Sequence, residues 1–548
     1  MAIGSFQIIL LRRLHCLAIL FVLSASLMVA QSIYLPVSHE VYPFLKRMEA
    51  RGFLRQYRDA AKPLSRLEIA RHFVLLEGHI LEMTEVERNT YEYLKGEFNY
   101  ELDIVLGSSE PSETRGHLMF MYLQNGILNL DFNGQLEQRN IGSKQVRLRS
   151  QGFKLYGYAT DDIGYYLNFV DNREVGGALN PTKSNTPDPG IVSTKRETEV
   201  LEYNTIEAQV TLALGQFQLS LEKMQNVWGS GRNGNIIFST KTPSYPQFKL
   251  RFPITDWMDF IYLHADLNSA MIDSGRSYIS GSSSMAEYYR PVDRLKFIAA
   301  HQLEISVMDG LDLSLGESVV YSDRGPLLIY MIPIMFFKSA EHYNNDKDNI
   351  QWFFNADVNL IPDVNCYATL LLDDLSTDNL LGSSKANNEV AYTIGFQAYD
   401  VLKDNLEITC EYTRLNPWVY HHKFSATNVS SNGYDLGHWI GQNADNVFLE
   451  LSYRPSRVWQ FGSSYERFRK GGEKDIAYHY QNDLTAPQFL FGPLRDEESF
   501  CLYGRYQFLR DGFITLSAKS REVKDEAGLD PLLGSQMEYR LNIRYGIW

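Results

Sequence analysis

The stretch IEAQVTLALGQFQLSL, residues 206–221, decides the fold class, because its apolar and polar residues alternate one by one. In an extended chain Val210 and Leu214 lie on one face, whereas Gln209 and Thr211 lie on the other. The glycine in the middle of the stretch marks a tight turn. The segment therefore predicts a β-hairpin with one apolar face and one polar face.

The same two-residue period continues along most of the chain. It is present in residues 128–136, in residues 303–315 across Asp309-Gly310, and in residues 537–547 before Trp548. Tilted membrane strands of ~10 residues, each with its loop, divide residues 111–548 into roughly 16 to 20 strands. The sequence therefore predicts an all-β transmembrane barrel of antiparallel strands over this region, with a soluble propeller or multi-domain β protein as the alternative.

The N-terminal segment and the composition agree with a barrel in the outer membrane. Arg12 and Arg13 precede an apolar run that ends at Val29, and the small residue Ala30 follows, so residues 1–30 are predicted to be a signal peptide. A retained membrane helix is the alternative, although polar residues interrupt the run. No later apolar run is long enough for a membrane helix, so a fold that spans a bilayer must be a closed barrel. The formal net charge of −14 argues against a nucleic-acid partner.

Residues 31–110 change to a helical period and predict a small α-helical domain. Apolar residues recur at helical spacing within Val41–Met48. Ser65–Glu68 and Thr84–Glu87 have the spacing of capping boxes, in which each side chain satisfies a free backbone N–H. We expect three short helices that form one bundle or plug the barrel.

The start of this head, LPVSHEVYPFLKRMEARGFLRQYRDAAKPLSRLEIARHF (residues 35–73), resembles an S-layer homology module. The shared order is a hydrophobic helix, a glycine, a short turn, and a second helix with basic and acidic residues. Such modules often bind cell-wall polymer. The resemblance therefore implies peptidoglycan as a candidate partner of the helical domain.

Three stretches break the alternation and gather aromatic and polar residues. They are VWGSGRNGNIIFSTKTP (227–243), PIMFFKSAEHYNNDKDNIQW (333–352) and YTRLNPWVYHH (412–422), and NGYDLGHWIGQNADN (432–446) follows the third. The glycines of the first stretch match GxGxxG, but β-formers and prolines follow where a nucleotide site needs a helix.

The residue types in these stretches suit a sugar, because aromatic rings stack on sugar faces, and planar donors, acceptors and arginine bind hydroxyl and acid groups. The candidate saccharide-binding residues are Trp228, Arg232, Asn233, His342, Tyr343, Asp348, Arg414, Asn416, Trp418 and His421.

Catalytic and metal-binding patterns are weak in this sequence. On a strand, the adjacent residues His421 and His422 would point to opposite faces and make a poor metal pair. Asp373 and Asp374 are also adjacent and would point to opposite faces of a strand, so they make a poor glycosidase pair. We therefore expect no enzymatic activity, no metal and no cofactor, with a barrel enzyme that acts on lipid or glycan as the alternative.

In this order, the aromatic and polar segments resemble those of the capsule assembly Wzi family of outer-membrane proteins. The resemblance extends over most of residues 33–548 and implies a barrel of about eighteen strands with a periplasmic helical bundle. It further implies binding of surface polysaccharide and a role in capsule or exopolysaccharide assembly or attachment at the surface of a Gram-negative-type bacterium. Outer-membrane lipid and the barrel insertion machinery are then expected partners. The alternative function is a porin for sugars or other small solutes.

Overall fold

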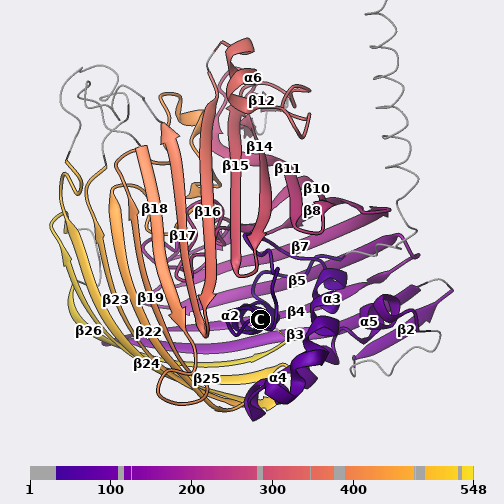
Figure 1. Ribbon diagram of the computed structural model, residues 1–548. Helices are drawn as coiled ribbons and strands as arrows, with labels where there is room; N and C mark the ends of the chain where they lie inside the picture. The colour runs from indigo at the N-terminus through magenta and orange to yellow at the C-terminus, as the bar shows by residue number, and fades with distance from the viewer. Residues whose placement is uncertain are drawn as a thin grey trace, which may run out of the picture.

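The computed structural model shows a closed wall of strands with a cluster of helices at one end (Figure 1). It describes residues 33–108, 117–124, 126–280, 288–345, 347–374, 389–473, 476, 488–528 and 533–546. The predicted signal peptide and Trp548 lie outside these residues. No helix in the described part of the chain is long and apolar enough to cross a membrane.

Eighteen antiparallel strands close into one barrel, which confirms the predicted architecture. The ring closes where β26 pairs with β3, for example Leu541 with Gln138. Two short strands, β2 (Met119–Leu123) and β6 (Ser193–Arg196), pair with the edges of β3 and β7. The eighteen strands are β3 (Gly126–Ile141), β4 (Lys144–Tyr158), β5 (Ile163–Gly176), β7 (Val200–Leu214), β8 (Phe217–Met224), β10 (Tyr245–Thr255), β11 (Met258–Ile272), β14 (Asp293–Met308), β15 (Leu311–Ser322), β16 (Asn349–Ile361), β17 (Val364–Asp374), β18 (Glu389–Ala398), β19 (Leu406–Leu415), β22 (Ala444–Ser456), β23 (Trp459–Lys470), β24 (Arg495–Leu509), β25 (Gly512–Asp525) and β26 (Gly534–Tyr545).

Strand β7 shows that the outer face of the barrel is apolar. Gln209 and Thr211 point into the barrel and are 3% and 1% exposed, whereas Val210 and Leu214 point outward and are 56% and 53% exposed. A soluble sandwich or propeller would bury the apolar residues and expose the polar ones. The opposite arrangement is that of a membrane barrel. The transmembrane prediction is therefore confirmed, and the soluble alternative is excluded.

The two ends of the barrel differ in the length of their connections. At the short-turn end, strands join through tight turns such as 215–216 and 309–310, which confirms both predicted hairpins. At the opposite end, most connections are long, among them 225–244, 323–348 and 416–443. We call this second end the long-loop end.

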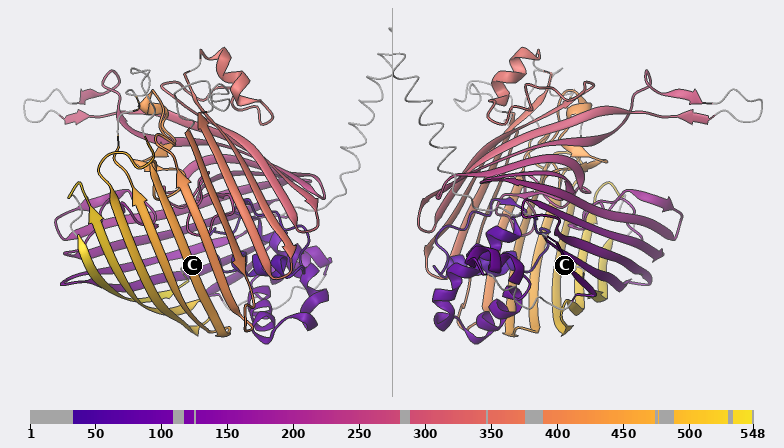
Figure 2. Two further views of the ribbon diagram at one scale, coloured as in Figure 1. Left: turned by 60° about the vertical axis from the view of Figure 1, so that its left-hand side comes forward. Right: turned by 90° about the vertical axis from the view of Figure 1, so that its right-hand side faces the viewer.

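The helical head lies at the short-turn end of the barrel (Figure 2). It consists of α2 (Val41–Ala50), α3 (Arg66–Leu76), the 3-10 helix η1 (Glu77–Glu82), α4 (Glu85–Lys95) and α5 (Asn99–Leu106). Buried apolar residues of these elements, including Leu45, Phe73 and Leu102, form a core of their own. The sequence predicted three helices. The additional helix α5 follows Gly96, which caps the C-terminus of α4, and buries Leu102 in the same core.

The two predicted capping boxes have different outcomes. At α4 the box is complete, because Thr84 Oγ1 accepts from Glu87 N at 3.2 Å and Glu87 Oε2 accepts from Thr84 N at 2.8 Å. At α3, Ser65 Oγ accepts from Glu68 N at 3.2 Å, but the Glu68 carboxylate lies 3.2 Å from Arg251 Nη2 on β10. The predicted box at Ser65 is therefore only half formed, because Glu68 contributes to a contact between head and barrel.

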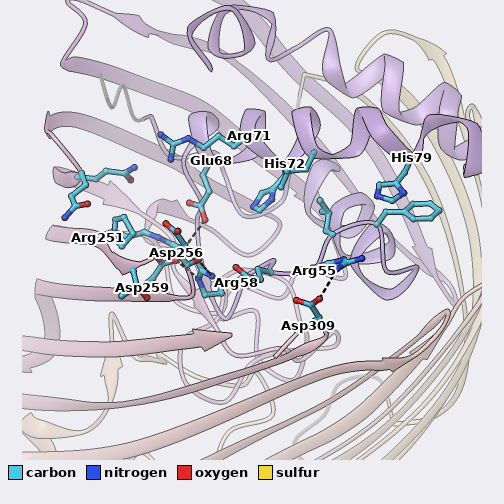
Figure 3. A pocket seen from close by; sticks show the side chains of 18 of the residues that line it. Arg55, Arg58, Glu68, Arg71, His72, His79, Arg251, Asp256, Asp259 and Asp309 are labelled. Atoms are coloured by element: carbon cyan, nitrogen blue, oxygen red, sulfur yellow. Dashed lines mark hydrogen bonds and ion pairs between the residues drawn. The ribbon is translucent and has the colours of Figure 1, made fainter. Parts of the chain in front are cut away.

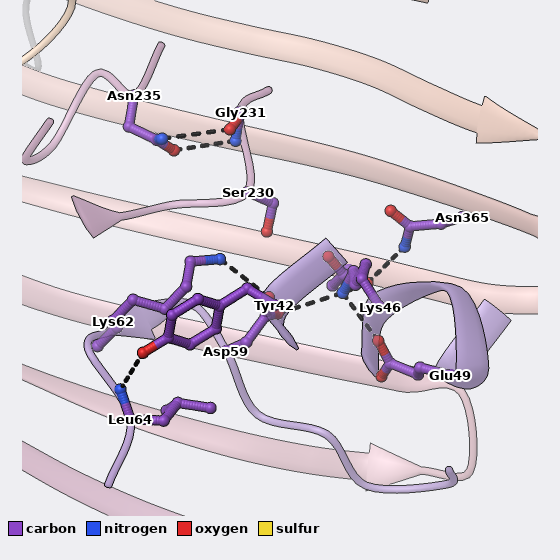
Figure 4. Close-up of polar contacts among 12 residues, drawn as sticks. Tyr42, Lys46, Glu49, Asp59, Lys62, Leu64, Ser230, Gly231, Asn235 and Asn365 are labelled. Atoms are coloured by element: carbon purple, nitrogen blue, oxygen red, sulfur yellow. Dashed lines mark hydrogen bonds and ion pairs between the residues drawn. The ribbon is translucent and has the colours of Figure 1, made fainter. Parts of the chain in front are cut away.

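A buried cluster of charges joins the head to the inner wall of the barrel. Lys46 Nζ on α2 lies 2.8 Å from Glu49 Oε2, 3.2 Å from Asp59 Oδ1 and 2.6 Å from Asp357 Oδ1 on β16. Figure 4 shows Lys46 between Glu49 and Asp59, with Lys62 on the other side of Asp59. Burial alone would lower the pKa of Lys46, but the three carboxylates raise it well above its ordinary value. Lys46 is therefore charged although its side chain is only 1% exposed.

Carboxylates in the short turns hold the outer side of the head. Arg47 Nη2 lies 2.6 Å from Asp400 Oδ1 in the turn between β18 and β19. Arg55 Nη1 lies 3.1 Å from Asp309 Oδ2 in the turn between β14 and β15. The head is thus fixed by ion pairs to several turns and to the inner wall.

The loop 225–244 turns into the lumen instead of extending the wall. Its short strand β9 (Val227–Trp228) pairs with β1 (Ala61–Lys62) at the end of the head, so that Trp228 lies opposite Ala61. The Trp228 ring centroid lies 4.9 Å from that of Phe238 and 5.9 Å from that of Phe353 on β16. These rings belong to one apolar core, which includes inward-facing residues of β11, β14 and β16. The lumen is therefore filled at this level by the loop, which we call the inward loop.

Candidate functional site

The segment 416–443 packs on the inward loop at the long-loop end of the barrel. Tyr420 Oη donates to Ile236 O at 2.6 Å. Trp418 and Tyr420 have φ angles of +67° and +75°, in the left-handed region that bulky residues rarely adopt. Such strain concentrates at functional sites, where the surrounding structure enforces it. This segment therefore directs attention to the long-loop end.

A cavity of about 350 Å³ opens beside this segment, and we call it the rim cavity. It lies between α6 (Phe337–Tyr343), the first residues of β16, and the chain that follows Tyr420. Its lining includes Lys338, His342, Trp352, His421, His422 and Lys423. Amines, imidazoles and an aromatic ring thus converge at the end of the barrel that carries the long loops.

The lysines Lys338 and Lys423 lie near His422, and the carboxylates Glu341, Asp348, Asp373 and Glu389 line the same cavity. Burial, and then Lys423 and Lys338, lower the pKa of His422 to about 4, so its ring is neutral at pH 7. Its Nδ1 lies 2.7 Å from Thr427 Oγ1. Lys338 Nζ also donates to Glu341 Oε2 at 2.7 Å. The cavity therefore combines cationic donors, carboxylate acceptors and a neutral imidazole, which suits the hydroxyl groups of a sugar, and Lys423 can contact an acid group.

The structure corrects the expected geometry of the histidine pair. The sequence placed His421 and His422 on a strand with opposite orientations, but β19 ends at Leu415 and both residues lie in the loop beyond it. Both line the rim cavity. His421 Nε2 lies 3.1 Å from Gln442 Nε2, a contact that fixes its ring.

Of the ten predicted saccharide-binding residues, His342, Asp348 and His421 meet at the rim cavity. Asp348 is 2% exposed, accepts from Tyr330 Oη at 2.7 Å and pairs with Arg324. Burial raises the pKa of Asp348, although Tyr330 and Arg324 act in the opposite direction. Tyr343, at the end of α6, is 82% exposed.

Three other predicted residues lie in the inward loop. Trp228 is buried in the lumen core. The backbone N–H groups of Arg232 and Asn233 donate to the Glu411 carboxylate at 2.6 Å and 3.0 Å, and Asn233 Nδ2 donates to Glu466 Oε1 at 2.5 Å. These contacts attach the loop to the wall.

The remaining three residues lie where β19 ends. Arg414 Nε donates to Asn416 Oδ1 at 3.1 Å, and the Arg414 guanidinium lies 3.8 Å from the Phe489 ring centroid. Trp418 is buried, and its N–H donates to Gln442 Oε1 at 2.7 Å. A role of these residues in saccharide binding stays a prediction.

Most lining residues of the rim cavity were not among the predicted ones, including its basic and aromatic residues Lys338, Trp352, His422 and Lys423. Three of these four lie inside the quoted segments, and Lys423 follows directly after YTRLNPWVYHH. A search for basic and aromatic residues next to the predicted histidines would have found them.

A second cavity, of about 820 Å³, lies at the short-turn end between the head and the inner wall (Figure 3). Its arginines face carboxylates: Arg58 Nε lies 2.8 Å from Asp259 Oδ2, and Arg251 Nη2 lies 3.2 Å from Glu68 Oε1. These pairs connect α3 and the chain before it to β10 and β11. The cavity is thus part of the seam between head and barrel.

Fold and site together define an outer-membrane β-barrel with a helical head at its short-turn end, an inward loop in its lumen and a polar cavity at its long-loop end. The chain belongs to the capsule assembly protein Wzi family, whose family model matches residues 189–524.

A solved structure agrees with this fold. Wzi from Escherichia coli, described as an outer membrane protein involved in group 1 capsule assembly and a carbohydrate-binding β-barrel, is similar at 12% sequence identity. The match has a TM-score of 0.56 and covers 94% of this chain and 100% of that one. OprD from Pseudomonas aeruginosa is similar at 12% identity and a TM-score of 0.41, over 76% of this chain and 94% of that one. A search of curated proteins found no match.

Proposed function

We propose that this protein binds surface polysaccharide at the rim cavity and assists the assembly or attachment of capsule or exopolysaccharide at the cell surface. The observation that carries the proposal is the convergence of Lys338, Lys423, three histidines and Trp352 in one cavity at the long-loop end. Membership of the capsule assembly family supports it, as does the carbohydrate-binding description of the E. coli protein. The proposed role is binding rather than catalysis, because these side chains suit the holding of a glycan.

The orientation of the barrel follows from its connections. Outer-membrane barrels have short periplasmic turns and longer extracellular loops. We therefore place the helical head, residues 31–110, in the periplasm and the rim cavity outside the cell, after removal of residues 1–30. The expected partners are outer-membrane lipid, the barrel insertion machinery and, through the head, peptidoglycan.

The porin alternative makes a different prediction for ion flow. Trp228, Phe238 and Tyr420 lie in an apolar core inside the barrel, and the head occupies the short-turn end. A lumen packed with side chains leaves little room for a solute. We expect single channels of the intact protein in planar bilayers to show no stable open-porin conductance. A stable, open conductance would favour the porin function instead.

Replacement of Lys423 by alanine is expected to weaken binding of an acidic capsular polysaccharide about tenfold, because a charge-assisted hydrogen bond contributes about 1.5–3 kcal/mol. Binding is measured by surface plasmon resonance on the detergent-solubilised barrel. Lys524→Ala is the matched control, since Lys524 is an exposed lysine near the same end and pairs with Glu522. Equal affinities of the two variants would argue against the rim cavity as the binding site.

A further inference from the structure

The connection between β15 and β16 passes along the outside of the barrel. We call residues 324–343 the arm. Its buried residues Tyr330 and Phe337 pack against Tyr262 and Tyr321, which point away from the lumen. The outward orientation of Tyr321 follows from β15, because Leu315 lies on the same face of this strand and is 47% exposed. Figure 1 places α6, the last part of the arm, at the end of β15 opposite the helical head.

The arm covers polar side chains on the outer wall. Glu317 and His301 face outward, with His301 Nε2 3.3 Å from Glu317 Oε1. Phe337 N on the arm donates to Glu317 Oε1 at 2.5 Å, and Trp352 Nε1 donates to Glu317 Oε2 at 3.2 Å. Tyr262 Oη donates to Tyr330 O at 2.9 Å. A carboxylate on the lipid face of a barrel is costly, and these contacts shield it.

The opposite face of the arm is apolar and exposed. Leu328 and Ile334 are 79% and 81% exposed, and Met331, Ile332 and Phe336 are also exposed. The sequence GPLLIYMIPIMFF, residues 325–337, contains no charged residue, whereas Arg324 precedes it and Lys338 follows it. Two prolines exclude a continuous helix here, and most of this stretch forms turns.

We propose that the arm inserts its exposed apolar residues into the outer leaflet of the membrane, while Arg324 and Lys338 keep their partners Asp348 and Glu341. Two observations select lipid as the partner. The exposed face of the arm continues the apolar outer face of the barrel, where Leu313 and Leu315 are exposed on β15. Residues 325–337 also contain no charged residue, so the arm can enter hydrocarbon without burying a charge. The arm thereby extends the lipid-facing surface at one flank and fixes the wall next to the rim cavity.

The test places a fluorescent probe on the arm. Cys366, Cys410 and Cys501 are replaced by alanine, and Ile334→Cys is labelled with an environment-sensitive nitrobenzoxadiazole dye in the full chain. Leu81→Cys is the matched control, because Leu81 lies on η1 of the head and is 92% exposed. Both proteins are reconstituted into vesicles of phosphatidylcholine and phosphatidylglycerol, with or without lipids that carry a nitroxide on the acyl chain.

We expect the nitroxide lipid to quench the probe at position 334 several-fold more strongly than the probe at position 81. Aqueous dithionite is expected to reduce the probe at 334 several-fold more slowly, with vesicles made permeable so that both sites are accessible. Similar quenching and similar reduction at the two positions would overturn the proposal. Protection from both reagents, together with a dimeric mass in detergent, would indicate a protein partner and would overturn it equally.

Discussion

Replacement of Lys46 by methionine is expected to destabilise the protein by about 3–5 kcal/mol, the cost of breaking a buried ion pair by removal of one partner. Glu49 and Asp357 would then lose the ammonium group that they share with Asp59, in a place where water does not replace it. Because Asp357 lies on β16, the loss also weakens the attachment of the head to the barrel. We expect a lower temperature for the heat-induced shift in gel migration and faster proteolysis of the head.

Lys62→Met is the matched control for this prediction. Lys62 Nζ lies 2.9 Å from Asp59 Oδ2, but in this variant Asp59 keeps Lys46. The expected loss is therefore only about 1 kcal/mol. Equal destabilisation by the two substitutions would show that the buried cluster does not depend on Lys46.

The same cluster predicts a pH dependence. Burial would raise the pKa of Asp59, but Lys46 and Lys62 outweigh it and lower that pKa below its ordinary value. A carboxyl group with a lowered pKa stabilises the fold above its ordinary pKa and loses this contribution as the pH falls further. The part of the stability difference between the wild type and Lys46→Met that comes from Asp59 should therefore shrink below about pH 4. Burial raises the pKa of Glu49 in the same cluster, so Glu49 does not add to this loss. Thermal unfolding at a series of pH values measures the difference.

The strand pattern was sufficient to predict the barrel. Apolar and polar residues alternate wherever one face of a strand contacts lipid and the other contacts polar groups. This alternation is lost in the run FIYL, residues 260–263, and in FIAA, residues 297–300, which are apolar on both faces. The structure gives the reason: the inward loop covers their inner face, and the arm covers part of their outer face. A continuous apolar run indicates a strand that is buried on both sides. The two apolar runs therefore indicated that both faces of these strands are buried. They did not indicate which segments of the chain bury them.

The candidate site could be predicted by segment but not by residue. The rim cavity combines α6 with His421 and Lys423, which lie some eighty positions later in the chain. Which side chains meet there depends on how far each loop folds over the wall, and local sequence does not determine this. The loop beyond β19 also reorients the adjacent pair His421 and His422, which a strand would have separated.

Trp228→Ala is expected to lower the free energy of unfolding by about 3–5 kcal/mol, the usual cost of deleting a large buried aromatic side chain. Trp228 packs against Phe238 and Phe353 and joins the inward loop to the head through its pairing with Ala61. The substitution removes a contact in the lumen core, and the rim cavity keeps all its lining residues. We therefore expect unchanged affinity for the polysaccharide, a lower unfolding temperature and some ion conductance through the loosened lumen.

Lys423→Ala is the counterpart of this variant, because it is expected to weaken binding while the unfolding temperature stays unchanged. Together, the two variants distinguish the structural role proposed for Trp228 in the lumen from the ligand contact proposed for Lys423. If Trp228→Ala weakened binding without loss of stability, Trp228 would contact the saccharide, as its sequence context predicted, and the inward loop would belong to the binding site. Since Trp228 is 1% exposed and lies beside the head, such a result would also require the polysaccharide to enter the lumen.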